Sequence, residues 1–421
     1  MLKGLSRFWM RSLIRAGKTQ QTQATKLIKK LLVTPKIKTK MKARPATKPS
    51  TKLSTKLSTA SGLTSGKAAT RATPTSRTQK SAKHPVSSSG KWLTSYYSSI
   101  ANNATLPVRR MSYCLYLPTH FPKVTLATPT QSWPLIVMLH GCEQTASAFS
   151  QGTRMNQLAE TKGYAVLYPQ QSLRSHPNRC WRWYDKATQD GGGDVTMIVG
   201  MIEKVARQYA IDRTRIYLCG MSAGAAMANI VALNHPDLIA AIGLHSGPVF
   251  GAGHNPISAY GVMQHGAGSR VKSAIDEVQR RVPAFPGMPT ILIHGQDDKT
   301  VRSVNQVQLA QQSLLLNHLA PDSGIPIVAK AAGKPGSRHR GHAYDIADFY
   351  LRKNLLLRVA RIMHLEHAWS GGDASLPYNS AAGPDASKMM LDFFSKHRRL
   401  DTSQVSAKAA DNKTDNIAQR K

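Results

Sequence analysis

The chain has 421 residues, of which 41% are hydrophobic, and its 57 Lys and Arg against 22 Asp and Glu give a formal net charge of +35. This composition supplies at least one sizeable core, but no uninterrupted apolar run approaches the roughly 18 residues of a membrane span, which excludes a transmembrane protein. Four cysteines without a CxxC pair exclude a disulfide-dense scaffold and disfavour a structural zinc site.

The basic charge is concentrated at the N-terminus, where 21 Lys and Arg precede residue 91 and the first acidic residue is Glu143. Residues 34–90 are rich in Lys, Ser and Thr, punctuated by Pro and low in complexity. Such a segment buries too little apolar surface to offset its chain entropy, so we expect a disordered linker.

Residues 1–33 are expected to form a basic amphipathic helix, because on a helical wheel the apolar side chains of the first 20 residues cluster opposite the basic ones. Four interpretations stay open: a solvated cationic arm, an anchor to an anionic membrane or polymer-granule surface, a targeting segment of the mitochondrial type, and a salt-sensitive nucleic-acid contact. Sequence-specific nucleic-acid recognition is not expected, because no aromatic residues are interleaved with the lysines.

From Met111 onward, short apolar runs alternate with segments of helical periodicity. The predicted strands are residues 111–117, 135–139, 165–168, 215–220, 239–245, 290–295 and 358–365. The predicted helices are residues 153–161, 194–209, 222–233 and 303–316, and a last one opens in DASKMMLDFF. This alternation predicts an α/β domain over residues 91–398, with a parallel or mixed sheet covered on both faces, and a polar tail over 399–421.

The string Gly220-Met221-Ser222-Ala223-Gly224 lies between a predicted strand and a predicted helix. In this context G-x-S-x-G is typical of a nucleophilic serine on a sharp turn, with the helix N-terminus beside it. An ordinary glycine-rich turn is the alternative. We predict Ser222 as a catalytic nucleophile.

A serine nucleophile needs a base and an orienting acid, which follow it in the order Asp or Glu, then His, in this kind of site. Asp297 and Asp298 follow the strand at 290–295, and His367 follows the strand at 358–365. His364 is predicted to be a packing residue on that strand. Its neighbourhood, H-x-E-H, matches no zinc motif, so no metal is expected.

Two further histidines, His245 and His294, lie at strand ends and are interpreted as satisfied core residues. The turn His140-Gly141-Cys142 follows the strand at 135–139, where a second backbone donor for an oxyanion hole is expected. The backbone N–H groups of Cys142 and Ala223 are the predicted pair.

Eight segments together form a specific pattern: PLIVMLHGCEQTASAF, GTRMNQLAETKGYAVLYPQQ, CWRWY, GMSAGAAMA, HSGPVFGAG, HGQDDKTV, HAWSGG and GPDASKMMLDFF. Through them the chain resembles the polyhydroxybutyrate (PHB) depolymerase family of esterases, which also contains feruloyl and acetylxylan esterases. The resemblance covers about residues 105–398 and implies an α/β-hydrolase fold. Two positions depart from the family pattern, with Gln296 in place of an aspartate and Glu366 in place of a glycine.

The resemblance implies Ser222 as nucleophile, His367 as base and Asp298 as orienting acid. Cys142 and Cys180 fall in the family's HGC and CW motifs and could form a bridge in an oxidising compartment, with free thiols as the alternative. By analogy, Trp181, Trp183 and Trp369 are candidates for lining the ester pocket, with ordinary packing as the alternative.

Two functions follow. The first is a serine esterase without a cofactor, acting on poly- or oligo-hydroxyalkanoate esters or on feruloyl- or acetyl-type esters. The second is a protein that binds a granule, membrane or polyanion surface through residues 1–90, with hydrolysis secondary. Relatives are commonly secreted, which implies an extracellular location, yet the N-terminus lacks a secretory apolar core, so intracellular or granule-associated locations stay open.

Overall fold

The computed structural model describes residues 89–99, 108–121, 132–330 and 341–399, without the side chains of residues 326–330. The predicted amphipathic helix, nearly all of the predicted linker and all but the first residue of the predicted tail lie outside this part of the chain. Among the helices that are described, none is long and apolar enough to cross a membrane.

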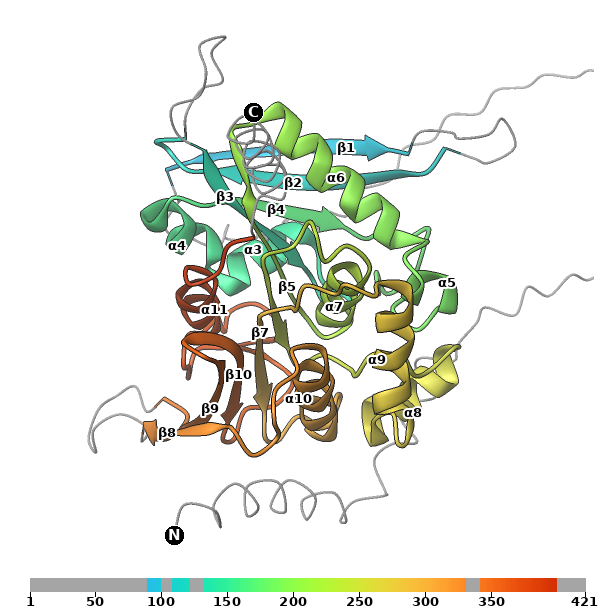
Figure 1. Cartoon of the computed structure of the whole chain (residues 1–421). Helices are drawn as coiled ribbons and strands as arrows, with labels where there is room; N and C mark the ends of the chain where they lie inside the picture. The colour runs from blue at the N-terminus through green and yellow to red at the C-terminus, as the bar shows by residue number, and fades with distance from the viewer. Residues whose placement is uncertain (1–88, 100–107, 122–131, 331–340, 400–421) are drawn as a thin grey trace, which may run out of the picture. The chain divides into compact units, whose positions relative to one another are not determined.

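Ten strands form one sheet in the order β1-β2-β4-β3-β5-β6-β7-β10-β9-β8 (Figure 1). They are β1 (Lys91–Ser98), β2 (Arg110–Leu117), β3 (Trp133–Leu139), β4 (Ala165–Gln170), β5 (Ile211–Met221), β6 (Ala241–His245), β7 (Thr290–Gly295), β8 (Ile325–Lys330), β9 (Tyr344–Leu351) and β10 (Asn354–Ile362). The strands from β4 to β10 in this order run parallel, while β1 and β2 at one edge and β9 and β8 at the other pair antiparallel.

The sheet carries helices on both faces. These are α3 (Ala146–Thr153), α4 (Met155–Lys162), α5 (Lys186–Gln189), α6 (Asp194–Gln208), α7 (Ala223–Asn234), α8 (Pro256–His265), α9 (Arg270–Arg281), α10 (Val304–Leu316) and α11 (Ala386–Phe394). Two short strands, β11 (Trp369–Ser370) and β12 (Asn379–Ser380), pair separately from the main sheet.

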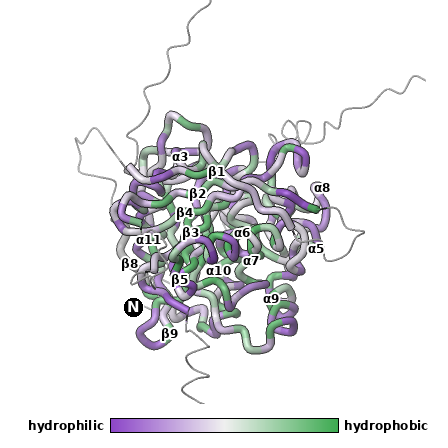
Figure 2. The backbone as a smooth tube through the Cα atoms, turned by 90° about the horizontal axis from the view of Figure 1, so that it is seen from above, coloured by the Kyte–Doolittle hydropathy of each residue, from purple (hydrophilic) through white to green (hydrophobic). Residues whose placement is uncertain are grey.

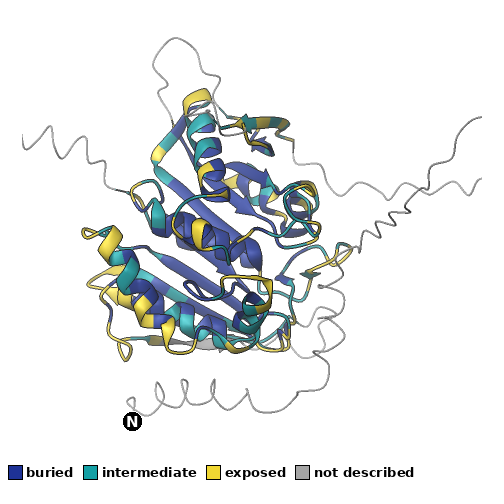
Figure 3. Cartoon of the chain, turned by 90° about the vertical axis from the view of Figure 1, so that its right-hand side faces the viewer, coloured by how far each residue is buried: buried dark blue, intermediate teal, exposed yellow. Residues whose placement is uncertain are grey.

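Alternation along the buried strands divides the interior into two cores. Leu135, Val137 and Leu139 of β3 contribute to the core under α6, α7, α9 and α10, whereas Ile136 and Met138 contribute to the core under α3, α4 and α11. Hydrophobic residues concentrate along the central strands (Figure 2), and these strands are buried while the outer sides of the helices are exposed (Figure 3). The predicted mostly parallel sheet with helices on both faces is confirmed.

The predicted strands all occur within a few residues of their expected bounds, but some elements differ. The helix expected at 153–161 is α4, which begins at Met155 because Arg154 before it adopts the left-handed region with φ 55°; the separate helix α3 that ends at Thr153 was not predicted. The sequence patterns also did not predict β1, β8, β9, β11, β12, α5, α8 and α9.

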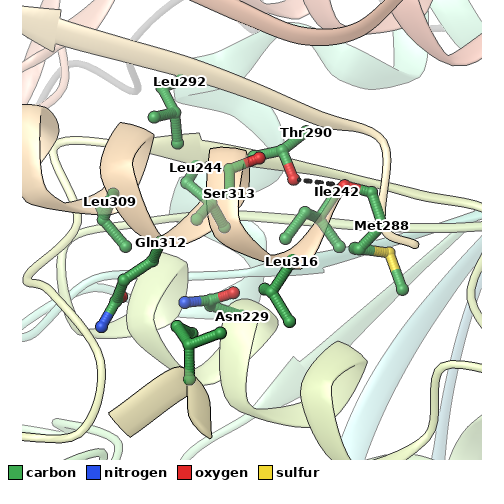
Figure 4. A pocket seen from close by; sticks show the side chains of 11 residues that line it. Asn229, Ile242, Leu244, Met288, Thr290, Leu292, Leu309, Gln312, Ser313 and Leu316 are labelled. Carbon is green, nitrogen blue, oxygen red and sulfur yellow. Dashed lines mark hydrogen bonds between the residues drawn. The ribbon is translucent and has the colours of Figure 1, made fainter. Parts of the chain in front are cut away.

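A small cavity of about 10 Å³ lies between the sheet and helices α7, α9 and α10 (Figure 4). Its lining includes the polar side chains of Asn229, Gln312 and Thr290, and Thr290 Oγ1 donates a hydrogen bond to the Met288 carbonyl at 2.8 Å. This volume is about the least that holds one water molecule, so the cavity is too small for an ester substrate.

Candidate active site

Ser222 lies on a tight turn between β5 and α7, with φ 56° and ψ −122°. Its N–H donates to the His245 carbonyl at 2.9 Å, which fixes the turn against the end of β6. A Cβ atom on Gly224 would lie 2.0 Å from the Leu139 carbonyl oxygen, and one on Gly220 would lie 2.6 Å from the same atom. The two glycines are therefore required for close packing, and the serine occupies a strained conformation directly beyond the carboxyl end of the central strand β5.

A carboxylate and an imidazole meet beyond the ends of two adjacent parallel strands. Asp298 follows β7, His367 follows β10, and the two strands pair directly. His367 Nδ1 lies 2.7 Å from Asp298 Oδ2, and Asp298 Oδ1 accepts hydrogen bonds from the N–H groups of Thr300 (2.9 Å) and Val301 (2.8 Å). The carboxylate is buried and fully engaged, so it holds the imidazole in one orientation.

The structure distinguishes the two candidate aspartates. Asp298 contacts His367, whereas Asp297 is half exposed and lies 3.5 Å from His364, measured between Oδ2 and Nδ1. The expectation that His364 is a packing residue on a strand is wrong: β10 ends at Ile362, and the His364 side chain is 82% exposed on the turn that follows. A left-handed φ of 57° at His364 belongs to this turn.

His245 and His294 are buried beside this pair, as expected for core histidines. His294 Nε2 donates to the Val301 carbonyl at 2.7 Å and lies 3.6 Å from Asp298 Oδ2. Burial lowers the pKa of His245 to about 3, and burial also lowers the pKa of His294. Burial alone would raise the pKa of Asp298, but the His367 beside it brings that pKa below its usual value, so the carboxylate is ionised at neutral pH.

These buried histidines predict a loss of stability in mild acid. In the unfolded chain a histidine binds a proton near pH 6.5, whereas burial lowers the pKa of His140 to about 4 and that of His245 to about 3. Between about pH 6.5 and 4 the unfolded state therefore binds more protons, so the free energy of unfolding falls as pH falls, by about 1.4 kcal/mol per pH unit for each such group.

Urea unfolding at pH 7.0, 6.3 and 5.6 measures this effect above the range in which most carboxylates titrate. His245→Gln is the matched variant, and its stability is expected to depend less steeply on pH. An unfolding midpoint that stays constant over this range would contradict the assignment of these histidines as buried and neutral.

The turn after β3 lies against the serine. A Cβ atom on Gly141 would lie 3.6 Å from Ser222 Cβ and 3.5 Å from the Met221 carbonyl oxygen. Ala223 is the first residue of α7, so its N–H has no acceptor within the helix. Cys142, the residue after Gly141, is joined by a disulfide to Cys180, which ties this turn to the loop that follows β4.

The tryptophans differ from the expectation that they line an ester pocket. Trp181 and Trp369 have no exposed surface, and Trp183 is 5% exposed. The indole N–H of Trp181 donates to the His140 carbonyl at 2.9 Å, and Trp369 stacks on His245 with ring centroids 5.0 Å apart. These side chains therefore pack in the interior, which is the alternative that the sequence left open.

Sequence reasoning missed two contacts around the site. Gln144 Oε1 accepts a hydrogen bond from the Gly141 N–H at 2.8 Å, and the Tyr378 hydroxyl donates to the Glu143 carboxylate. The second contact ties the turn after Cys142 to the loop that follows His367. Neither could be found from a motif, because the partner of each side chain is set by loop geometry.

Within the described residues, no cluster of three or more His, Cys, Asp or Glu side chains is arranged to hold a metal ion. The chemistry of the site is that of a serine, an imidazole, a carboxylate and backbone amides. A mostly parallel sheet covered on both faces, with the serine turn after its strand β5, defines an α/β-hydrolase fold.

Residues 111–334, more than half of the chain, match the family described as Esterase PHB depolymerase. The chain belongs to this family. The matched segment contains Ser222 and Asp298 and ends before His367.

Similar proteins include poly(3-hydroxyalkanoate) depolymerase C of Paucimonas lemoignei, which is 31% identical over 182 residues, 42% of this chain and 44% of that protein. Acetylxylan esterase A of Aspergillus oryzae is 38% identical over 109 residues, 25% of this chain and 34% of that protein. The matches thus span less than half of the length of these relatives. Among solved structures, an acetyl xylan esterase from Aspergillus awamori has the same fold, with a TM-score of 0.50 at 17% identity over 72% of this chain and 99% of that one.

Proposed function

We propose that the protein is a serine esterase that hydrolyses carboxylic esters through an acyl-enzyme intermediate. The observation that carries the proposal is the 2.7 Å contact between Asp298 Oδ2 and His367 Nδ1, beyond the carboxyl ends of the parallel strands that also carry the strained turn of Ser222. Family membership supports the same reaction class.

In the proposed reaction, Ser222 Oγ attacks the ester carbonyl carbon as His367 Nε2 accepts its proton, and Asp298 stabilises the imidazolium that forms. The tetrahedral oxyanion accepts hydrogen bonds from the N–H groups of Cys142 and Ala223. Collapse of this intermediate breaks the bond to the alcohol, which leaves with the proton from His367. Water then attacks the acyl-enzyme by the same route, releasing the acid and restoring Ser222.

The substrates that we propose are esters of poly- or oligo-hydroxyalkanoates or acetyl esters of the plant-polysaccharide type, in keeping with the names of the similar proteins, and feruloyl esters, which the sequence resemblance implies. The test is hydrolysis of p-nitrophenyl acetate and butyrate by the wild type and by Ser222→Ala. Activity in the wild type that the substitution leaves unchanged would contradict the proposed nucleophile.

A second function is supported by the charge of the N-terminal region, where 21 Lys and Arg occur before residue 91 without an acidic residue. We propose that this region binds an anionic surface. The full chain is expected to co-sediment with vesicles containing phosphatidylglycerol at 50 mM salt, to dissociate at 500 mM salt because counter-ions screen the attraction, and to leave phosphatidylcholine vesicles unbound. Equal sedimentation with both vesicle types would contradict electrostatic binding.

A further inference from the structure

His140 is a buried residue directly after β3 whose imidazole folds back onto the turn that it opens. Its side chain has no exposed surface, and Nδ1 lies 2.7 Å from the carbonyl oxygen of Gly141. The same turn approaches Ser222 through Gly141, on which a Cβ atom would lie 3.6 Å from Ser222 Cβ. His140 therefore contacts the backbone that lies against the proposed nucleophile.

The partners of the ring determine which nitrogen carries the proton. Nε2 lies 3.1 Å from the backbone N of Gln171, which can only donate, so Nε2 is an acceptor. Burial lowers the pKa of His140 to about 4, so the ring is neutral at neutral pH and has one N–H. That proton is on Nδ1, which donates to the Gly141 carbonyl.

The Gly141 carbonyl and the Cys142 N–H belong to one trans peptide, since Gly383-Pro384 is the single cis bond of the described residues. In a planar trans peptide the C=O and the N–H point in opposite directions. A hydrogen bond that fixes the carbonyl towards the imidazole therefore fixes the N–H on the other side. A flipped peptide would present the carbonyl oxygen to a developing oxyanion and repel it.

We propose that His140 is a positioning residue that holds the Gly141–Cys142 peptide so that the Cys142 N–H faces the oxyanion of the tetrahedral intermediate. This inference rests on the proposed esterase function and explains why the Cys142 N–H points towards the oxyanion. His140 itself does not touch the substrate and transfers no proton.

The surroundings of His140 hold the ring and its backbone in place. Its carbonyl accepts the indole N–H of Trp181 at 2.9 Å, and the two rings lie 5.4 Å apart between centroids. Behind the ring, Gln171 Nε2 donates to Asp194 Oδ2 at 2.6 Å, and Arg109 pairs with the other oxygen of Asp194 at 2.6 Å. The imidazole therefore has a single orientation, which a positioning role requires.

Three substitutions separate the donor at Nδ1 from the bulk of the ring. His140→Asn places an amide group near the position of Nδ1, His140→Gln places one near the position of Nε2, and His140→Phe keeps a ring without polar atoms. With p-nitrophenyl acetate, we expect the Gln and Phe variants to lose on the order of 10²–10³-fold in kcat, the cost of one oxyanion donor, with KM within a few-fold. The Asn variant is expected to stay within about tenfold of the wild-type kcat.

A second readout reports on the oxyanion directly. A trifluoromethyl ketone adds to the nucleophilic serine as an anionic hemiketal, so its affinity is expected to fall in the Phe and Gln variants by about the same factor as kcat/KM. Thermal unfolding of each variant is measured alongside. If the Phe variant does not fold, the comparison of Asn with Gln carries the test, since both keep a polar group.

The outcomes distinguish this inference from the proposed function. A wild type without esterase activity, or a fully active Ser222→Ala variant, overturns both. Loss of activity in Ser222→Ala together with a wild-type kcat in His140→Phe or His140→Gln overturns the positioning role alone. So does an Asn variant as impaired as the Phe variant, because rescue by a donor at the Nδ1 position is what positioning predicts.

Discussion

Replacement of Ser222 by Ala is expected to lower kcat for p-nitrophenyl acetate by on the order of 10⁶-fold, effectively to background. The reason is that the acyl-enzyme forms on the hydroxyl oxygen of Ser222. The turn offers no substitute nucleophile nearby, because a side chain at Gly220 or Gly224 would clash with the backbone. Alanine removes one atom from a residue that is 9% exposed, so the fold is expected to be retained. Initial rates over a range of substrate concentrations measure the effect.

Ser273→Ala is the matched control for this change, because Ser273 is exposed on α9 and its hydroxyl bonds only the Arg270 carbonyl of its own helix. This variant is expected to keep the wild-type rate. Equal rates for the wild type and Ser222→Ala would exclude Ser222 as the nucleophile and would move surface binding to the first place among the functions.

Asp298→Asn is expected to lower kcat by about 10⁴-fold. The substitution keeps the shape of the side chain but removes its charge, so the imidazolium that forms at His367 loses its stabilising partner. An amide that donates to Nδ1 would also favour the wrong tautomer of the imidazole. The two backbone N–H groups that donate to Asp298 Oδ1 can donate equally to the side-chain oxygen of the asparagine, so little change in folding is expected.

The adjacent Asp297 provides the matched control for this prediction. It has the same chemistry, lies one residue away and pairs with the exposed His364, so Asp297→Asn is expected to stay within a few-fold of the wild-type kcat. Measurements of kcat and KM for both variants at neutral pH test the assignment. A larger loss in Asp297→Asn than in Asp298→Asn would reverse the roles of the two aspartates.

Much of this architecture could be predicted because the central strands are short apolar runs, which are buried on both faces in a parallel sheet. The G-x-S-x-G turn was placed between a strand and a helix, and β5 and α7 occupy those positions. The sequence order also placed Asp298 and His367 each after a predicted strand; these strands are β7 and β10, and their direct pairing is seen only in the structure.

The remainder depends on contacts that local patterns do not encode. β9 is interrupted by Asp345 and Asp348, and the edge strand β8 contains Pro326, so neither matches the uninterrupted pattern of a central strand. The prediction for His364 was wrong because the apolar pattern continues past Ile362, where the turn that leads to His367 ends β10. The hydrogen bond of His140 joins it to its own neighbour, and only the fold of the turn creates it.

The disulfide between Cys142 and Cys180 makes the identity of a purified sample depend on how it was produced. A reducing cytosol yields the same chain with two thiols, and the turn that carries Cys142 is then fastened by hydrogen bonds and packing alone. An oxidising compartment, or oxidation after lysis, yields the bridged form. Two preparations of the same sequence can therefore differ at the proposed oxyanion donor, although their masses differ by only two hydrogens. Titration of free thiols should identify the form before the rates of two preparations are compared.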